Sequence, residues 1–179
     1  MKWFENDHVV YSNRGVNNGL NGKSPDSFNL TPHKDHVLCR DKEGNPTAIY
    51  SDRTWDFNPY RLSAKSINKL YFDDCLGCKD IALVNLIYEE IRFILYTILY
   101  QPGSGRTGRT SASTFVQYFY TVRKVGRFCI EQADNTLSIG LTVNDVFSNV
   151  IYMKAFLNRD EVTGSDRKQI SSILIILEQ

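Results

Sequence analysis

The stretch STFVQYFYTVRKVGRFC, from Ser113 to Cys129, carries two different surfaces within one helical pattern. Its apolar residues recur at steps of three and four, which places them on one face of a helix; they are Phe115, Phe119, Val122, Val125 or Gly126, and Cys129. The face that points away from this apolar stripe carries the cations Arg123, Lys124 and Arg127. We predict a helix that starts near Ser111 or Ser113, buries the apolar stripe and presents the cations to solvent.

The segment before this helix, GSGRTGRT from Gly103 to Thr110, is small and basic. The free N–H groups at a helix start attract anions, and small residues allow a phosphate to approach closely. Arg106 and Arg109 add charge and forked donors. Hydroxyl donors come from Thr110, Ser111 and Ser113. These features suit a nucleic-acid backbone, and the alternative is a solvated helix face with a basic turn.

The long apolar run from Ile81 to Tyr100 contains Glu89, Glu90 and Arg92. A membrane span rarely carries three charges near its centre, so we predict a buried helix, capped by Asp80 and ended by Pro102 and Gly103. The N-terminus has no apolar signal core. We therefore expect a cytoplasmic protein without membrane contact, whose four cysteines are reduced thiols.

Residues 1–59 form the first predicted domain, an irregular arm rich in Asn, Gly, Asp and Pro. Within it, the stretch from His36 to Tyr50 predicts a small β-hairpin whose turn spans Glu43 to Pro46. Val37 and Cys39 would then face one side of the hairpin.

Residues 60–179 form the second predicted domain, which makes the protein mainly α, with a bundle of four or five helices. Ser63 would cap a short helix that runs to Leu70 or Tyr71. Thr142, with Asp145 three positions later, has the spacing of a capping box. The inward residues of the helix that follows would be Val146, Phe147, Val150, Ile151 and Leu157.

Gly164 and Ser165 open the last predicted helix, whose apolar positions are Ile170, Ile173, Leu174 and Leu177. The pattern runs to Gln179 with no stop signal, so we expect a longer parent protein.

From about Ile81 to Gln179, the order of these parts resembles the core-binding domain of tyrosine recombinases, the phage-integrase family. The matching segments are SGRTGRTSASTFVQYFYTVRKVGRFC, LSIGLTVNDVFSNVIYMKAFL and VTGSDRKQISSILIILEQ. The resemblance implies a SAM-like helical bundle that grips one side of duplex DNA while a downstream catalytic domain grips the other. It also implies homo-oligomers on DNA.

The resemblance implies that residues in three segments of this sequence contact DNA. The loop and helix start supply Arg106, Arg109, Thr110, Ser111 and Ser113. The basic helix supplies Arg123, Lys124 and Arg127. The start of the last helix supplies Arg167 and Lys168.

The catalytic apparatus of the family does not match this chain. Family catalysis needs an arginine-rich pocket, a lysine, a His-x-x-Arg element and a nucleophilic tyrosine. The residues three positions after the histidines are Tyr11, His36 and Cys39, so the His-x-x-Arg element is absent. We expect this chain to need no cofactor and not to cleave DNA by itself, although the parent protein would be a recombinase.

Two other constellations suggest different chemistry. His33, His36 and Cys39 together with Cys75 and Cys78 have spacings that could hold structural zinc, and the alternative is surface histidines with half-buried thiols. Glu89 and Glu90 could suggest acid–base chemistry, but no further carboxylate or histidine has a sequence spacing that would place it beside them. We interpret one as solvent-facing and the other as the partner of an arginine.

The leading expectation is therefore the DNA-binding portion of an integrase-like recombinase from a mobile element. Net charge is only +1, which argues against a wholly basic nucleic-acid binder but leaves local patches possible. The rival is a protein–protein interaction or regulatory module of a phage or mobile element, in which the helices are a docking surface. Guanidinium groups scattered on opposite sides of the helical scaffold, or locked in ion pairs within the protein, would undo the DNA hypothesis.

Overall fold

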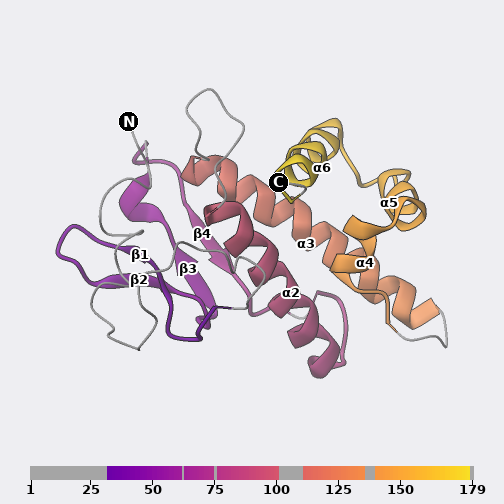
Figure 1. The fold of residues 1–179 in the computed structure, drawn as a ribbon, viewed down its shortest axis with the longest axis horizontal. Coiled ribbons are helices and arrows are strands. Elements are labelled where there is room, and N and C mark those ends of the chain that lie inside the picture. Colours follow the sequence, from indigo (N-terminus) through magenta and orange to yellow (C-terminus); the bar gives the residue numbers. More distant parts are fainter. Residues whose placement is uncertain (1–31, 62, 75, 101–110, 136–139, 178–179) are drawn as a thin grey trace. The chain divides into compact units, whose positions relative to one another are not determined.

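The computed structural model describes residues 32–61, 63–74, 76–100, 111–135 and 140–177. The chain divides into a first unit of residues 1–73 and 105–113 and a second unit of residues 74–104 and 114–179. Figure 1 labels the elements of both. The predicted fold class is confirmed, because the protein is mainly helical with small antiparallel sheets toward its N-terminus.

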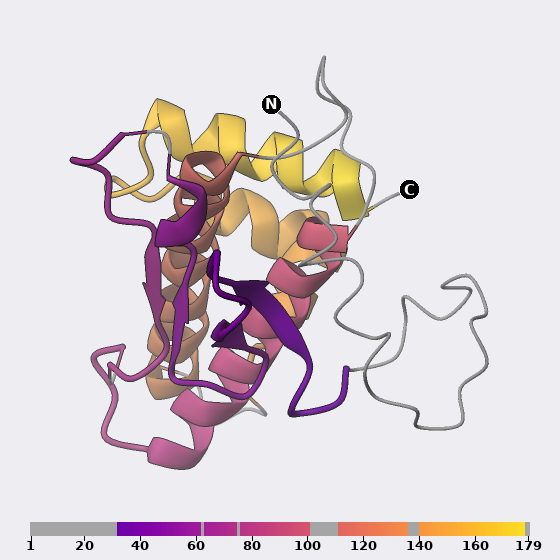
Figure 2. The ribbon, with the colours of Figure 1, turned by 90° about the vertical axis from the view of Figure 1, so that its left-hand side faces the viewer.

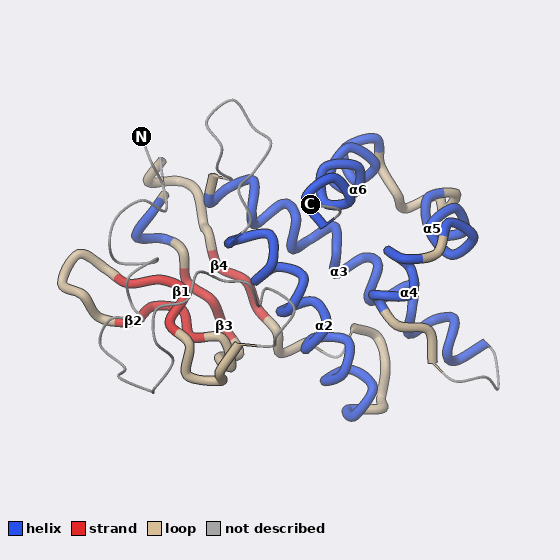
Figure 3. The backbone as a smooth tube through the Cα atoms, in the orientation of Figure 1, coloured by secondary structure: helices blue, strands red, loops and turns tan. Residues whose placement is uncertain are grey.

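The first unit contains all the strands that the structure describes, drawn in red in Figure 3. They form two antiparallel pairs, β1 with β2 and β3 with β4. Their bounds are Val37–Arg40 for β1, Pro46–Ile49 for β2, Thr54–Asp56 for β3 and Lys69–Tyr71 for β4. A single 3-10 turn, η2, spans Asn58–Tyr60 after β3.

The predicted hairpin is confirmed as β1 and β2. Its turn is closed by Asp41, whose carboxylate accepts a 2.7 Å hydrogen bond from the backbone N–H of Asn45. Gly44 adopts a φ of 89°, a conformation that glycine reaches without strain. The strand pairing is irregular between Val37 and Cys39, so Leu38 and Cys39 are both fully buried instead of alternating.

Aromatic residues build the core of the first unit. Trp55 and Phe57 are fully buried, and the Trp55 ring lies 4.8 Å from the Phe72 ring, centroid to centroid. The indole N–H of Trp55 donates to the carbonyl of Tyr50 across 3.3 Å. The buried indole therefore keeps a polar partner, which buried tryptophans need.

The predicted short helix from Ser63 to Leu70 or Tyr71 is wrong, because its last residues form β4. Trp55 pairs with Leu70 in the β3–β4 ladder, and Leu70 is fully buried between two more exposed neighbours. That alternation fits a strand. Pairing with β3 keeps residues 60–73 in the first unit, which extends beyond residue 59.

The second unit holds the main helices, which Figure 2 shows from the side. Their bounds are Ile81–Tyr100 for α2, Ala112–Asn135 for α3, Val143–Ser148 for α4, Val150–Leu157 for α5 and Gly164–Leu177 for α6. Within the described ranges, none of these helices has both the length and the apolar character that crossing a bilayer requires.

The predicted apolar stripe of α3 is confirmed, since each of its members is at most 1 % exposed; they are Phe115, Phe119, Val122, Val125 and Cys129. Helices α2 and α3 approach each other closely at Gly126. A Cβ atom at Gly126 would lie 2.8 Å from Ile87 Cγ2 and 3.1 Å from Ile91 Cδ1. Glycine at this position therefore lets the two helices pack together.

Two of the three predicted helix caps, those at Asp80 and Thr142, are confirmed, whereas the cap predicted at Ser63 is wrong because its helix does not form. Asp80 accepts a 2.9 Å hydrogen bond from the N–H of Ala82 at the start of α2. Thr142 and Asp145 form a reciprocal capping box at α4, with both bonds at 3.0 Å. These bonds satisfy N–H groups that have no partner within the helix.

The single helix predicted after Thr142 is wrong, because Asn149 separates α4 from α5. Asn149 adopts an extended backbone, and its side chain accepts a 2.9 Å hydrogen bond from Ile151 N, which caps α5. The break changes the direction of the apolar residues. Val150 and Ile151 were predicted to face inward, but they are 66 % and 70 % exposed.

Candidate nucleic-acid interface

The ten predicted DNA contacts fall into three structural groups. Arg106, Arg109 and Thr110 lie outside the described residues. Ser111 directly precedes α3 and Ser113 lies in its first turn, with their hydroxyl oxygens 3.3 Å apart. The remaining five are cations on α3 and α6, and their surroundings are described below.

Arg123 and Arg127, four residues apart on α3, both face Asp74. Arg123 forms an ion pair with this carboxylate, and an Arg127 nitrogen lies 4.0 Å from the same oxygen. Asp74 also accepts hydrogen bonds from the hydroxyl of Tyr88 and from the N–H of Leu76. The Arg123 side chain is 22 % exposed and that of Arg127 is 52 % exposed, so Arg127 is more available to a ligand.

Lys124 is held by Asp166, the third residue of α6. The ammonium lies 2.7 Å from the carboxylate, which also accepts hydrogen bonds from Thr121 at 3.2 Å and from Thr163 N at 2.8 Å. Burial raises the pKa of Asp166, but the bonds from Lys124 and Thr163 outweigh it and lower that pKa to about 2. Asp166 therefore stays ionised and joins α3 to the start of α6.

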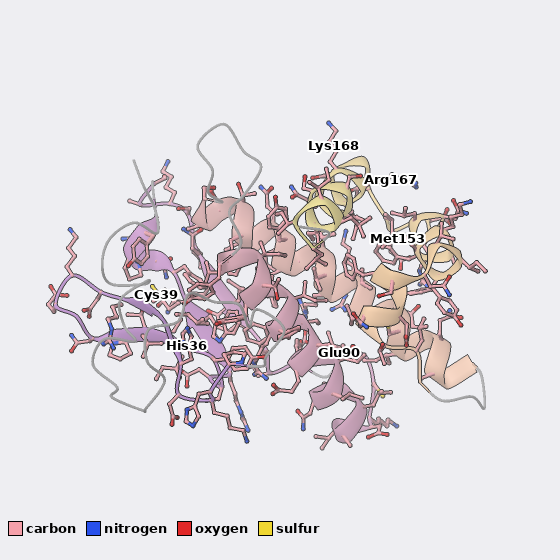
Figure 4. The ribbon with its side chains drawn as sticks, viewed as in Figure 1. His36, Cys39, Glu90, Met153, Arg167 and Lys168 are labelled. Carbon is pink, nitrogen blue, oxygen red and sulfur yellow. The ribbon has the colours of Figure 1, made fainter. Side chains whose placement is uncertain are left out.

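Arg167 and Lys168 follow Asp166 directly and are both exposed. Figure 4 shows Lys168 extending outward from α6. Within the described part of the chain, no carboxylate lies within ion-pair distance of either side chain. Thr163 and Asp166 cap this helix start through bonds of 2.8 and 3.2 Å. The two cations therefore project from an ordered helical turn.

A solvent-facing stripe runs along α3 at steps of three and four residues, and we define it by Gln117, Tyr120, Lys124 and Arg127. At its first member, Gln169 Nε2 of α6 donates a 3.0 Å hydrogen bond to Gln117 Oε1. The sequence of α3 contains no acidic residue before Glu131, and that of α6 contains only Asp166. Both helices thus present a surface poor in carboxylates.

The ion pairs do not cancel the charge of this region. Five cations contribute, namely Arg123, Lys124, Arg127, Arg167 and Lys168, whereas the carboxylates that face them in the described residues are Asp74 and Asp166. Among the described residues, Asp74 and Asp166 therefore offset cations of α3, whereas Arg167 and Lys168 have no carboxylate within ion-pair distance. A surface of this kind attracts polyanions, and the attraction weakens with added salt.

Glu89 and Glu90 have structural partners. Glu89 forms a 2.7 Å ion pair with Arg92, which confirms the prediction that one of the two glutamates has an arginine partner. Glu90 is half-buried and accepts a 2.7 Å hydrogen bond from Val143 N, so it ties α2 to the first turn of α4. Burial raises the pKa of Glu90, and the N–H groups of Val143 and Asn144 oppose that rise. Glu90 thus serves the fold.

The weak zinc candidates are not brought together as far as the structure describes them. Among the described residues, no group of three or more His, Cys, Asp or Glu side chains could hold a metal ion, and Cys75 lies outside them. Cys39 is buried beside the Thr47 hydroxyl, and burial raises its pKa to about 12. Burial also lowers the pKa of His36, and His33 accepts a hydrogen bond from Asp35 N.

Sequence reasoning missed the residues that organise this surface. Asp74 and Asp166 were not identified as partners of the helix cations, because each lies far along the chain from them. The spacing Thr163–Asp166 was a usable signal, since a hydroxyl followed three residues later by a carboxylate marks a capped helix start. Gln117 and Gln169 carried no signal by themselves.

Comparison of the chain with protein-family models, with curated proteins and with solved structures finds no match.

Proposed function

We propose that the second unit binds duplex DNA, mainly through phosphates, as the DNA-binding portion of an integrase-like site-specific recombinase. The observation that supports this function best is the charge of α3 and α6. Two helices joined by a buried carboxylate carry an excess of positive charge, and Arg167 and Lys168 project from them. Phosphate contacts need such cations on a rigid support and no particular base sequence.

The α3 cations meet the condition that tells against DNA contact, because Arg123 and Lys124 are held in ion pairs and Arg127 lies 4.0 Å from Asp74. The ion pairs therefore change which cations we assign to DNA. Arg123 and Lys124 stabilise the fold through Asp74 and Asp166, so their share in DNA contact is smaller than the sequence predicted. Arg127, Arg167 and Lys168 are the main contacts in this proposal, because they are the more exposed cations. Arg106, Arg109, Thr110, Ser111 and Ser113 remain contacts predicted from the sequence.

The link to recombinases rests on the resemblance of three segments to the core-binding domain. In this proposal the helical unit positions a catalytic domain located downstream in a parent protein, and copies assemble on DNA. The chain itself supplies no His-x-x-Arg element. Its own contribution is therefore binding, with the strand-cleaving chemistry elsewhere.

The test is a titration of the whole chain with duplex DNA at several salt concentrations. We expect the logarithm of the binding constant to fall linearly with the logarithm of salt concentration, because phosphate contacts release counterions. Changing Arg167→Ala together with Lys168→Ala removes two contacts, so the slope should flatten by about two. Arg106→Ala with Arg109→Ala should flatten it similarly.

The matched control is Lys154→Ala, which removes an exposed cation from the last turn of α5. This variant should leave the slope unchanged. An affinity that ignores salt, or a slope that survives the double change on α6, would contradict the proposal. If the slope changes by the same amount per removed charge in Lys154→Ala and in the double variant of α6, only overall charge matters.

The exposed start of α5 favours a second candidate, a protein–protein interaction module. Val150, Ile151 and Tyr152 are consecutive and 66 %, 70 % and 41 % exposed. Adjacent exposed apolar residues of this size often mark contact with another protein. Changing Ile151→Ser would weaken such contact without altering DNA binding, whereas Arg167→Ala with Lys168→Ala would do the reverse.

A further inference from the structure

We propose that the chain forms a two-fold symmetric dimer in which the outer edge of β4 pairs, in antiparallel direction, with the same edge of a second copy. This inference goes beyond the proposed function and does not rest on DNA binding. It starts from the backbone of β4 and from the side chains along its open edge.

One edge of β4 is paired with β3, which lies beside it in Figure 3, and the other edge is open. The carbonyl of Asn68 accepts a 2.8 Å hydrogen bond from the residue after β3, and Phe72 N donates a 2.8 Å hydrogen bond to the residue before it. Because backbone direction alternates along a strand, the N–H and C=O groups of Lys69 and Tyr71 point to the opposite edge. Within the described ranges, these groups have no hydrogen-bond partner.

The features that protect an edge strand from other strands are missing or diverted in β4. Its ladder with β3 has no bulge, unlike that of β1 with β2, and its sequence has no proline. A lysine on an edge strand commonly keeps other strands away. Lys69 instead extends toward β3, where its ammonium lies 2.8 Å from the Asp56 carboxylate. The outer edge can therefore accept another strand.

The side chains along this edge complement those of a second copy. Tyr71 is 47 % exposed and Asp73 is exposed, whereas the alternate residues 70 and 72 are buried. In an antiparallel pairing centred on Tyr71, each tyrosine lies opposite the other, and each Lys69 lies opposite Asp73 of the second copy. Aromatic pairs and opposite charges at directly opposed positions both stabilise a sheet.

This complementarity favours a second copy over an unrelated peptide as the occupant. The edge supplies both the cation and the anion that the pairing needs, and two-fold symmetry uses each pair twice. The contact consists of a few backbone hydrogen bonds and three side chains from each copy. An interface of this size is small, so we expect a weak dimer that depends on protein concentration.

The test is sedimentation of the whole chain over a range of concentrations, without DNA. The mean mass of the wild-type chain should rise from that of a monomer toward that of a dimer. Tyr71→Pro removes an N–H that points away from β3, so the β3–β4 ladder should remain while the dimer weakens about tenfold or more.

A charge change tests the register of the pairing. Asp73→Lys places like charges opposite each other twice, so dimer affinity should fall on the order of tenfold. The matched control is Glu43→Lys, which makes the same change at an exposed position in the turn of the first hairpin. The control should leave dimer affinity unchanged.

A cross-link tests the geometry directly and covers the case in which Tyr71→Pro fails to fold. In the proposed register the two Cα atoms at position 71 lie about 5.5 Å apart, which a disulfide can span. Oxidised Tyr71→Cys should therefore give a 71–71 disulfide between copies, identified by mass spectrometry of its peptides. Glu43→Cys should give no corresponding 43–43 disulfide.

A wild-type chain that stays monomeric at every concentration would overturn the inference. So would a dimer that survives Asp73→Lys, one that Glu43→Lys weakens equally, or the absence of the 71–71 cross-link. The experiments contain no DNA, so the proposed function is decided separately by its own titration.

Discussion

Lys124 on α3 and Asp166 on α6 form an ion pair of 2.7 Å between residues that lie 42 positions apart in the chain. The same carboxylate caps its own helix through Thr163 and accepts a bond from Thr121. Asp166 is 6 % exposed, so it would be costly to bury without these partners. The contact converts a cation predicted to face DNA into part of the scaffold.

Replacing this carboxylate should weaken the fold in a pH-dependent way. Asp166→Asn removes the charge that Lys124 faces, so at neutral pH we expect a loss of about 1.5–3 kcal/mol in the free energy of unfolding. Because the pKa is lowered from 3.8 to about 2 in the folded state, this stabilisation is fully present above about pH 4 and fades toward pH 2. Denaturant unfolding at several pH values measures it.

The control for that change is Asp160→Asn, at an exposed position. This variant should leave the free energy of unfolding unchanged, since substitutions at exposed positions rarely change it by more than about 0.5 kcal/mol. An Asp166 effect that is the same at pH 2.5 and pH 7 would show that the ion pair is not its source.

Adding a methyl group at Gly126 should separate α2 from α3. The new Cβ of Gly126→Ala would lie 2.8 Å from Ile87 Cγ2, an atom that a helical isoleucine cannot easily move. We expect a loss of about 1–3 kcal/mol from overpacking. Thermal unfolding tests this. Gly164→Ala meets nothing within 4 Å and should be neutral or slightly stabilising, so equal losses at both positions would refute the close approach.

Glu90 should be replaceable by glutamine but not by alanine. Glu90→Gln keeps an acceptor for Val143 N and removes a charge that burial disfavours, so stability at pH 7 should be equal or higher. Since the pKa is raised from 4.5 in the folded state, ionised Glu90 costs stability as pH rises through the folded value. The advantage of Glu90→Gln should therefore vanish below about pH 4.

The alanine change at the same position tests the hydrogen bond rather than the charge. Glu90→Ala leaves Val143 N without this acceptor, and we expect a loss of about 1–3 kcal/mol. Chemical denaturation at pH 7 compares the three proteins. If alanine and glutamine behave alike, the bond between α2 and α4 contributes nothing measurable.

Removing the carboxylate at Asp74 should increase DNA affinity while it lowers stability. Asp74→Asn keeps acceptors for Tyr88 and Leu76 but releases Arg123 and Arg127 from a negative charge. Under the proposed function, duplex affinity should rise several-fold and the salt slope should steepen by about one. Asp73→Asn makes the same charge change at an exposed neighbour, and a matching effect there would contradict this role.

The sequence predicted those parts of the fold that depend on neighbouring residues. The hairpin turn and the caps at Asp80 and Thr142 arise from contacts within a few positions, so they are readable from the chain. The apolar stripe of α3 is readable because its residues recur at steps of three and four. The same holds for the concentration of cations on α3. Local periodicity therefore identified a mainly helical protein and the helices that carry its charge.

Only the tertiary structure determined which residues are buried and which carboxylates pair with the cations. Leu70 joins a strand because Trp55 pairs with it, and Val150 faces solvent because Asn149 interrupts the helix. Asp74 and Asp166 reach their cations only after α3 packs against distant segments. The physical reason is that ion pairing and burial depend on separation in space, which periodicity along the chain does not encode.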